Sequence, residues 1–505
     1  MRYKFFLHTS PVLLLIFICS VSCNRELEVK PVSVITNASF WKTESDVQGA
    51  LNGMYFSLRE MNKMTYQLGE GRSEVMTFGI AGTGGYDLFY QNTLNPNNLA
   101  ATGNYSSGVE WKGYYTIINT ANLLIKYVPG ISFANAADQQ RALAQAYAMR
   151  AYIYFVMVRT WGDLPLRLLP TEGYDPALVH LERSPVAAIF EQIKADIAEA
   201  LQLFPDNSIP AGRYFWSRPS ANALKAEVFL WTAKRLNGGT ADYTAALNAC
   251  TEVEDADATL LDNFADIFKY QNKGNREVLM AIRFQELEAA GFSYFRDMYM
   301  FAGLMPSNVS QYTRDLIGPT GTGHSVWSPS ALVRDQFTTD DTRRDASFYE
   351  IYSEEGGTQV YFTAAVMKGT GIVTAGGVRE YVSDIIIYRL ADVILMKAEA
   401  KNGLSQDPAA EMNRIRQRAY KDQFPAHTFV SGSPAQNDAA ILKERLLELV
   451  FEGKRWWDLV RYDKAFEIVP SLQARAADRY LLLFPISTNT LSLEPKVKQN
   501  PGYEQ

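Results

Sequence analysis

The stretch that most constrains the fold of this chain runs from Ala134 to Trp161 and mixes small residues with large aromatic ones. Alanine has the highest helix propensity, and small side chains beside rings let two helices approach closely. Gly162 and Pro165 then end the pattern. We therefore predict a long helix packed between other helices, on these alternating residues: Ala142, Ala144, Ala146, Tyr147, Ala148, Ala151, Tyr152, Tyr154 and Phe155.

Further helices are expected on both sides of this one. Helical spacing of apolar residues begins after Thr43 and again at Trp111, and three more helices follow over about 184–204, 217–236 and 241–254. Helix pairs with short turns are typical of tetratricopeptide repeats, although the strict 34-residue consensus is absent. The pattern favours a degenerate helical repeat.

The regular pattern is interrupted twice. Residues 69–108 are rich in Gly, Asn, Thr and Tyr and are predicted to form a long loop region, which in a compact domain is usually functional. Residues 260–383 are irregular, with strand-like runs at 277–284 and 359–367. Helices are expected again over 384–403, 407–421 and 437–462.

These segments predict one mainly α domain over residues 43–505. Its helical-repeat scaffold would comprise about 43–258 and 384–462, with a large irregular inserted lobe over about 260–383 that contains short strands. Residues 463–505 would form a C-terminal extended segment.

The N-terminus reads as a targeting segment. Arg2 and Lys4 precede an apolar run over 12–18, which is too short to span a bilayer, and small residues lead to Cys23. We interpret residues 1–22 as a lipoprotein signal peptide, Cys23 as the lipid attachment site and 23–42 as a tether. An ordinary cleaved signal with an incidental cysteine is the alternative.

Composition excludes some partners and favours others. The net charge is −6 and basic residues do not cluster, so nucleic acid is not expected as a partner. Aromatic residues make up 12% of the chain, with 28 Tyr and 8 Trp, and such rings stack on sugars as well as fill cores. Cys250 lies alone in an apolar helical pattern and is expected in the core.

Glu444, Glu448 and Glu452 recur every fourth residue and could suggest a glycoside hydrolase. Nearby cations (Arg445, Lys454, Arg455 and Arg461) would keep these carboxylates ionised, whereas a general acid needs a raised pKa. We therefore favour a structural ion-pair network over a catalytic pair.

No other group of residues has the pattern of a catalytic or metal site. The four histidines, His8, His180, His324 and His427, are isolated in the sequence. Three aspartates (Asp255, Asp257 and Asp262) lack the glycine turn and bidentate Glu of a calcium loop, so calcium is conceivable but unsupported. We expect no cofactor and no enzymatic activity.

Motifs along the whole chain resemble those of one family. In the N-terminal half they are Phe40-Trp41-Lys42-Thr43, Ala50-Leu51-Asn52-Gly53-Met54-Tyr55, Arg150-Ala151-Tyr152-Ile153-Tyr154-Phe155 and Trp161-Gly162-Asp163-Leu164-Pro165-Leu166. In the C-terminal half they are Tyr388-Arg389-Leu390-Ala391-Asp392, Phe451-Glu452-Gly453-Lys454-Arg455-Trp456-Trp457-Asp458-Leu459, Phe484-Pro485-Ile486 and Gln499-Asn500-Pro501-Gly502-Tyr503. The chain thereby resembles the SusD/RagB family of nutrient-uptake outer-membrane lipoproteins, with Trp161 where Phe is common and Ser487 where Pro is common.

The resemblance implies tetratricopeptide-like helix pairs with an irregular lobe packed against them. It also implies a non-catalytic, lipid-anchored protein of the outer membrane, facing the cell exterior. Such a protein would capture oligosaccharide and pass it to a SusC-like TonB-dependent transporter. Peptide as the ligand, a surface glycoside hydrolase and a purely structural envelope protein stay as alternatives.

The resemblance assigns no ligand-contacting residue, so the candidates come from the chemistry of the two irregular regions. Rings could stack on sugar faces, while guanidinium and amide groups bond vicinal hydroxyls. The candidates are Arg72, Tyr86, Phe89, Tyr90, Gln91, Asn92, Tyr294, Tyr299, Tyr312 and Trp327.

Overall fold

The computed structural model describes residues 40–82, 87–97, 109–288, 293–318 and 323–503. The chain divides into two units, residues 1–42 and 43–505. In the first, the rings of Phe40 and Trp41 meet edge to face.

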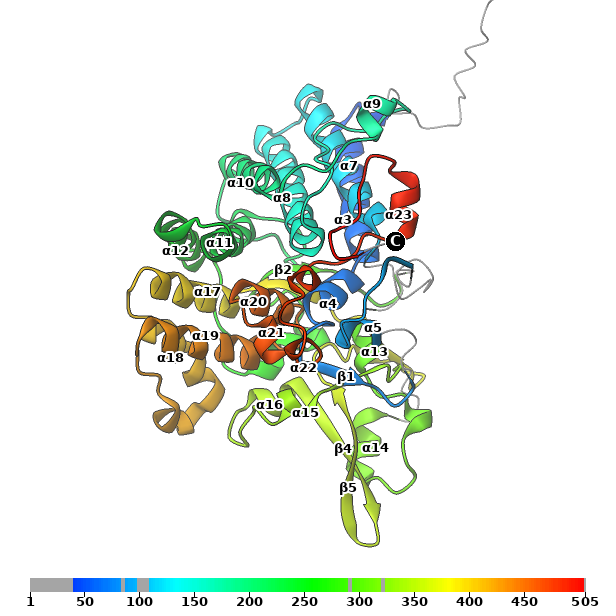
Figure 1. Cartoon of the computed structure of the whole chain (residues 1–505), viewed down its shortest axis with the longest axis vertical. Coiled ribbons are helices and arrows are strands. Elements are labelled where there is room, and N and C mark those ends of the chain that lie inside the picture. The colour runs from blue at the N-terminus through cyan, green and yellow to red at the C-terminus, as the bar shows by residue number, and fades with distance from the viewer. Residues whose placement is uncertain (1–39, 83–86, 98–108, 289–292, 319–322, 504–505) are drawn as a thin grey trace, which may run out of the picture. The chain divides into compact units, whose positions relative to one another are not determined.

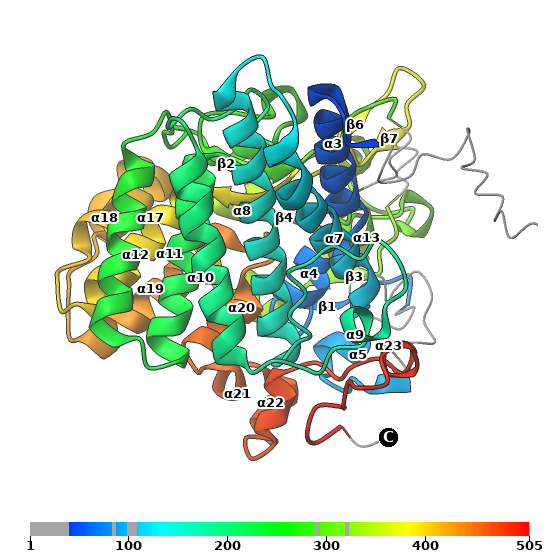
Figure 2. The same ribbon diagram turned by 90° about the horizontal axis from the view of Figure 1, so that it is seen from above.

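Long helices form the larger part of the second unit (Figure 1). From α3 to α18 each long helix packs on the next, and α19 packs on α17, so that the chain builds a curved stack of helices (Figure 2). The helices are α3 (Glu44–Glu60), α7 (Trp111–Tyr127), α8 (Ala136–Trp161), α10 (Val186–Leu203), α11 (Arg218–Arg235), α12 (Gly239–Glu254), α17 (Leu390–Gly403), α18 (Ala409–Tyr420) and α19 (Pro434–Leu449). This arrangement confirms the predicted mainly α, tetratricopeptide-like fold.

The longest helix of the stack is α8, and the sequence predicts it. Asn135 caps its first turn, and Gly162 ends it with φ 75°, a backbone conformation that favours glycine. All its residues from Ala148 to Trp161 are buried. Because its alanines leave room for the rings of its neighbours, α8 packs between α7 and α10.

The irregular residues between α12 and α17 contain short strands and helices. The hairpin of β4 (Phe348–Glu355) and β5 (Thr358–Val366) turns at Gly356 and Gly357, both with positive φ. The other antiparallel pairs are β1 (Met76–Phe78) with β3 (Trp327–Pro329), β2 (Val278–Ile282) with β8 (Ile385–Arg389), and β6 (Ile372–Val373) with β7 (Arg379–Glu380). Both predicted strand runs are confirmed.

Short helices lie in the irregular regions, between long helices, and in the C-terminal segment that was predicted to be extended. The region predicted as a long loop contains the end of α4 and the helix α5, as well as β1. The short helices are α4 (Lys63–Gly69), α5 (Asp87–Tyr90), α9 (Pro176–Val179), α13 (Phe295–Met298), α14 (Gln311–Ile317), α15 (Ala331–Arg334), α16 (Arg343–Ser347), α20 (Arg455–Arg461), α21 (Ala465–Ile468), α22 (Pro470–Gln473) and α23 (Thr488–Leu493).

Two predicted helices were wrong in their extent. The helix expected over 384–403 begins only at Leu390, because the run before it pairs with the buried strand β2. The helix expected over 437–462 is two helices, α19 and α20. Between them Phe451 and Gly453 take φ values of 66° and 76°, which no right-handed helix contains.

The interior holds charged as well as apolar side chains. Cys250 is fully buried on α12, which confirms it as a core residue. Among the described helices, none combines the length and the apolar character that crossing a membrane requires.

Candidate functional site

The two irregular regions predicted to hold the ligand meet in one ladder, formed by β1 and β3. Phe78 lies opposite Trp327 in this ladder. Past the strand ends, the N–H of Ala81 donates to the carbonyl oxygen of Ser325 at 3.1 Å, and the N–H of Ser325 donates to that of Tyr299 at 3.0 Å. Segments more than 240 residues apart in sequence therefore form one surface.

A chain of aromatic rings leads from the interior to this surface. Tyr294 stacks on Tyr66 with ring centroids 5.4 Å apart, and Tyr66 meets Trp327 edge to face at 5.4 Å. Trp327 is 6.4 Å from Tyr90, which meets Phe78 at 4.6 Å. The inner three rings are buried, whereas Phe78 is 43% exposed and Tyr90 is half-buried. The buried rings thus hold the outer two in a fixed position.

Polar groups lie beside the two outer rings. Gln91 is exposed, and its amide nitrogen lies 3.5 Å from the hydroxyl of Tyr90. Burial raises the pKa of Tyr90, so its hydroxyl keeps its proton at neutral pH. We call Phe78, Tyr90 and Gln91 the Phe78–Tyr90 surface. It offers two partly exposed aromatic rings, a hydroxyl and an amide.

Two of the predicted ligand residues, Arg72 and Asn92, lie inside the protein. The guanidinium of Arg72 donates to Asn92 Oδ1 at 2.7 Å and to the carbonyl oxygen of Leu481, between the rings of Trp456 and Phe484. Burial lowers the pKa of Arg72 to about 10, which leaves it charged at neutral pH. Arg72, before β1, and Asn92, after it, both bond to the C-terminal segment, at Leu481 and Ser471.

The remaining candidates differ in their exposure to solvent. Phe89, Tyr294, Tyr299 and Trp327 are buried, and the hydroxyl of Tyr299 donates to the backbone. Tyr312, on α14, is 66% exposed. Tyr86 lies outside the described residues. The structure thus brings Tyr90, Gln91 and Trp327 together.

Sequence reasoning missed Phe78. Its exposed ring belongs to a three-residue strand, and the apolar–polar–apolar pattern of Met76–Phe78 was the one available signal. That pattern is too short to distinguish an exposed ring from a buried one.

The three glutamates that could have suggested catalysis are buried in an ion-pair network. Glu444 and Glu448 both receive hydrogen bonds from Arg343, at 2.7 and 3.3 Å. Glu448 and Glu452 both receive hydrogen bonds from Arg389, at 2.6 and 2.8 Å. This confirms the structural interpretation.

The charges in that network set the protonation state of Glu448. Burial by itself would raise the pKa of this carboxyl, but Arg418, Arg389 and Arg343 outweigh burial and hold it well below its usual range. An ionised carboxylate has no proton to give to a leaving group. The cations differ from those predicted, because Arg445 and Arg461 pair with Asp392, Asp458 and Glu399 instead.

The histidines form no metal site in the part of the chain that the structure describes. His324 pairs with Asp297, and His427 pairs with Asp340 and stacks on Tyr420. Within these residues no group of three or more His, Cys, Asp or Glu side chains could hold a metal ion.

Comparison with known proteins identifies the family. The model of the SusD family matches residues 335–503, and a model described as "Starch-binding associating with outer membrane" matches residues 27–230. The structure of NanU from B. fragilis is 32% identical, covers 94% of this chain and 100% of that one, and superimposes with a TM-score of 0.83. The chain belongs to the SusD family.

Other SusD-family proteins match over nearly their full length. A SusD superfamily protein from Bacteroides vulgatus is 30% identical, with a TM-score of 0.79 over 92% of this chain and 100% of that one. SusD-like protein P38 of Formosa agariphila is 26% identical over 95% of this chain and 96% of its own length. Members of the family are known as outer-membrane-associated binding proteins rather than enzymes.

Proposed function

We propose that this SusD-family protein captures oligosaccharide at the cell surface and delivers it, uncleaved, to a SusC-like TonB-dependent transporter. The observation that carries the proposal is the Phe78–Tyr90 surface, where buried rings support two outer ones at the junction of distant segments. The starch-binding description of the matching family model supports saccharide as the ligand class.

The chemistry of the surface suits a sugar. The C–H faces of a pyranose pack on flat rings, and the Tyr90 hydroxyl and the Gln91 amide can each donate to and accept from its hydroxyls. So few contacts give weak binding, with a Kd on the order of micromolar to millimolar. Weak binding allows release to a transporter.

The N-terminal assignments extend the proposal to location. Residues 1–22 would direct export, Cys23 would carry the lipid, and 23–42 would link it to the single domain over 43–505. Anchored in this way, the protein would lie in the outer membrane and face the cell exterior. Cys23 lies outside the described residues.

The test is calorimetric titration of protein beginning at Asn24 with a panel of oligosaccharides and peptides. We expect saturable binding of one glycan class, with the glycan intact afterwards. Phe78→Ala and Tyr90→Ala should each weaken binding about tenfold, because each removes a stacking face worth about 1 kcal/mol or more. Both variants should unfold at nearly the parent temperature.

Tyr174→Ala is the matched control, since Tyr174 is 78% exposed on a different part of the chain. It should bind as the parent does. If Phe78→Ala and Tyr90→Ala also bind as the parent does, the surface is misassigned. Binding of peptides alone would replace glycan by peptide as the ligand, and cleavage of any glycan would overturn the non-enzymatic function.

A further inference from the structure

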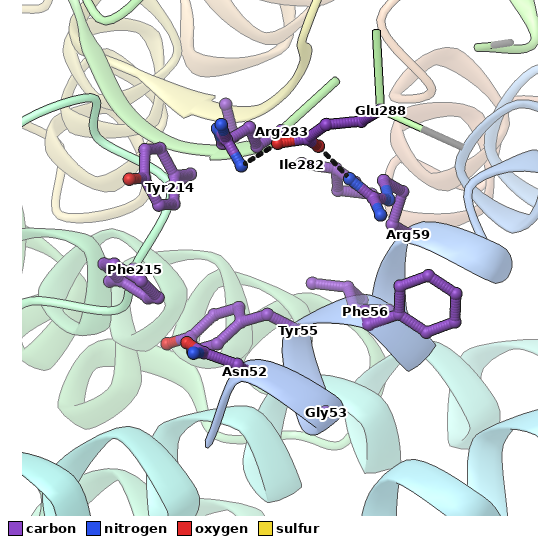
Figure 3. A pocket seen from close by; sticks show the side chains of 12 residues that line it. Asn52, Gly53, Tyr55, Phe56, Arg59, Tyr214, Phe215, Ile282, Arg283 and Glu288 are labelled. Carbon is purple, nitrogen blue, oxygen red and sulfur yellow. Dashed lines mark hydrogen bonds and ion pairs between the residues drawn. The ribbon is translucent and has the colours of Figure 1, made fainter. Parts of the chain in front are cut away.

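A second hollow lies away from the Phe78–Tyr90 surface, between α3 and the residues around β2 (Figure 3). Its volume is about 680 Å³, which is enough for a sugar residue or two. One wall is the face of α3 with Tyr55, Phe56 and Arg59. The other carries Tyr214, Phe215, Arg283 and Glu288. We call it the Arg59–Arg283 pocket.

Three charged side chains meet at its rim. Arg59 Nη1 lies 2.8 Å from Glu288 Oε2, and Arg283 Nη1 lies 2.8 Å from Glu288 Oε1. One carboxylate therefore bridges two guanidinium groups, and the charged residues described in the lining carry a net charge of +1. Arg59 Nε is buried and has no hydrogen-bond partner among the described residues. Arg59 therefore keeps one donor that its bridge to Glu288 does not use.

The bridging carboxylate comes from an exposed turn. The residue before it, Leu287, is 96% exposed and has φ 65°, a left-handed conformation that costs energy for a branched side chain. The Glu288 side chain is itself 31% exposed. Its carboxylate can therefore leave the two arginines without disturbing packed structure.

The aromatic wall is rigid. The ring of Tyr55 meets that of Phe215 edge to face at 4.9 Å, and Phe215 lies 4.6 Å from Tyr214. The Tyr55 hydroxyl accepts from the N–H of Trp216 at 2.8 Å and donates to Gln145 at 2.9 Å, which fixes its ring. Rings of this kind accept the apolar face of a pyranose, next to the two cations.

We propose that the Arg59–Arg283 pocket is a second saccharide site, which selects a sugar residue bearing a carboxylate. The ligand carboxylate takes the place of Glu288 between Arg59 and Arg283, and the sugar ring packs on Tyr214 and Phe215. This site goes beyond the proposed function because it uses other elements and specifies a charged ligand.

Charge explains the selectivity. A carboxylated sugar exchanges one anion for another, so both guanidinium groups stay paired. A neutral sugar that displaced Glu288 would leave two partly desolvated cations without a counter-charge, which is unfavourable. Between the two guanidinium groups the pocket therefore favours a carboxylated sugar over a neutral one.

Gly53 offers a steric test that leaves the fold intact. It lines the pocket from α3, and a Cβ added there would meet no described atom within 4 Å. Gly49, one turn earlier on the same helix, is equally open but does not line the pocket. Gly53→Leu should fill the pocket, and Gly49→Leu is its matched control.

The experiment titrates protein beginning at Asn24 with sialyllactose, a galacturonate tetrasaccharide and a glucuronate-containing disaccharide, alongside lactose and a sulfated disaccharide. We expect a carboxylated probe to bind and lactose not to bind at this site. Gly53→Leu should weaken that binding at least about tenfold, whereas Gly49→Leu should leave it unchanged. Phe78→Ala should also leave it unchanged, which separates this site from the proposed capture surface.

Glu288→Gln provides a gain-of-binding arm. Removing the internal competitor should tighten binding of the carboxylated probe roughly tenfold. Glu286→Gln, on the same turn but outside the pocket lining, should have no such effect. The inference is overturned if no carboxylated probe binds either the parent or Glu288→Gln at millimolar concentration. It is also overturned if lactose binds this site equally well or if only the sulfated sugar binds. Binding to Gly53→Leu with the affinity of the parent would overturn it as well.

Discussion

Glu448 carries its charge in the interior, where its carboxylate accepts hydrogen bonds from Arg389, Arg343 and Arg418. Removing an ion from water costs several kcal/mol, so these groups are stable only together. Each cation has a second carboxylate as well, such as Asp341 for Arg343 at 2.8 Å. The glutamates therefore join the irregular lobe to α19.

Replacing this one carboxylate should destabilise the whole protein. In Glu448→Gln, three buried guanidinium groups lose an anionic partner, and we expect a loss of about 3–5 kcal/mol in the free energy of unfolding. Urea denaturation at pH 7 measures it. Glu467→Gln is the control, because the Glu467 side chain is 64% exposed and, among the described residues, its one ion pair is with nearby Lys464. A loss below about 1 kcal/mol would contradict the network's role.

Glu70 has the opposite environment. It is fully buried, and its Oε1 accepts the N–H of Gly453 at 3.0 Å. Burial, outweighing this hydrogen bond, raises its pKa to about 8. At neutral pH the folded protein thus holds a proton on Glu70 that the unfolded chain, with an ordinary pKa near 4.3, has released.

Glu70 should therefore make the protein less stable as the pH rises. A raised carboxyl pKa contributes most below about pH 4.3, and the contribution is lost as pH rises to about 8, at up to about 1.4 kcal/mol per pH unit. Glu70→Gln removes that slope. We expect the free energy of unfolding of the variant to increase relative to that of the parent between pH 5.5 and pH 8.5. Parallel curves for the two proteins would contradict the raised pKa.

At the scale of elements, α4 and the turn between α19 and α20 approach unusually closely. A Cβ on Gly69 would lie 1.9 Å from the carbonyl oxygen of Gly453. A Cβ on Gly453 would lie 2.5 Å from that of Thr65, and φ there is 76°. The break between α19 and α20 thus lies where the backbone packs directly against α4.

Gly69→Ala should push these two backbones apart. Since neither is a flexible side chain, we expect a loss of about 3 kcal/mol in the free energy of unfolding. Gly49→Ala on α3 is the control, because its Cβ would meet no described atom within 4 Å. Inside a helix that change should stabilise by about 0.5–1 kcal/mol. Equal melting temperatures for the two variants would contradict the close approach.

The elements that the sequence predicted well are those with local causes. The alanine–aromatic pattern of α8 acts within a few residues, and so does the strand-like run over 359–367 that forms β5. The strand β8 and the turn at Phe451 depend on β2 and α4, which are far away in sequence. No local pattern carries that information, so both were predicted as helix.

The residues of the candidate site show the same difference between local and distant causes. Composition predicted that the regions around Tyr90 and Trp327 matter, and the structure places them together. Whether a ring such as Phe78 or Tyr294 faces solvent depends on which segment covers it. Arg72 shows the limit of prediction from sequence. The carbonyl oxygens to which it donates, those of Leu481 and Leu483, are more than 400 residues away.

At the scale of the whole molecule, the C-terminal segment ties the scaffold together. Asn500 donates to the carbonyl oxygens of Trp161 and Phe484, at 3.0 and 2.8 Å, and accepts from Arg183 at 2.6 Å. Phe484 in turn donates its N–H to Thr160 at 2.7 Å. The terminal Asn-Pro-Gly-Tyr motif thus has a structural role. The residues that hold the fold together differ from those proposed to bind the ligand.

Membrane attachment can be tested independently of ligand binding. If Cys23 carries acyl chains, each buried methylene contributes about 0.8 kcal/mol, and several chains make the anchor effectively permanent. Cys23→Ala expressed with its signal should lose palmitate labelling and leave the membrane fraction. Glycan binding should be unchanged, because the Phe78–Tyr90 surface lies in the unit over residues 43–505. A Cys250→Ala variant should stay labelled and membrane-bound, and a Cys23→Ala protein that does so would show that the attachment site is elsewhere.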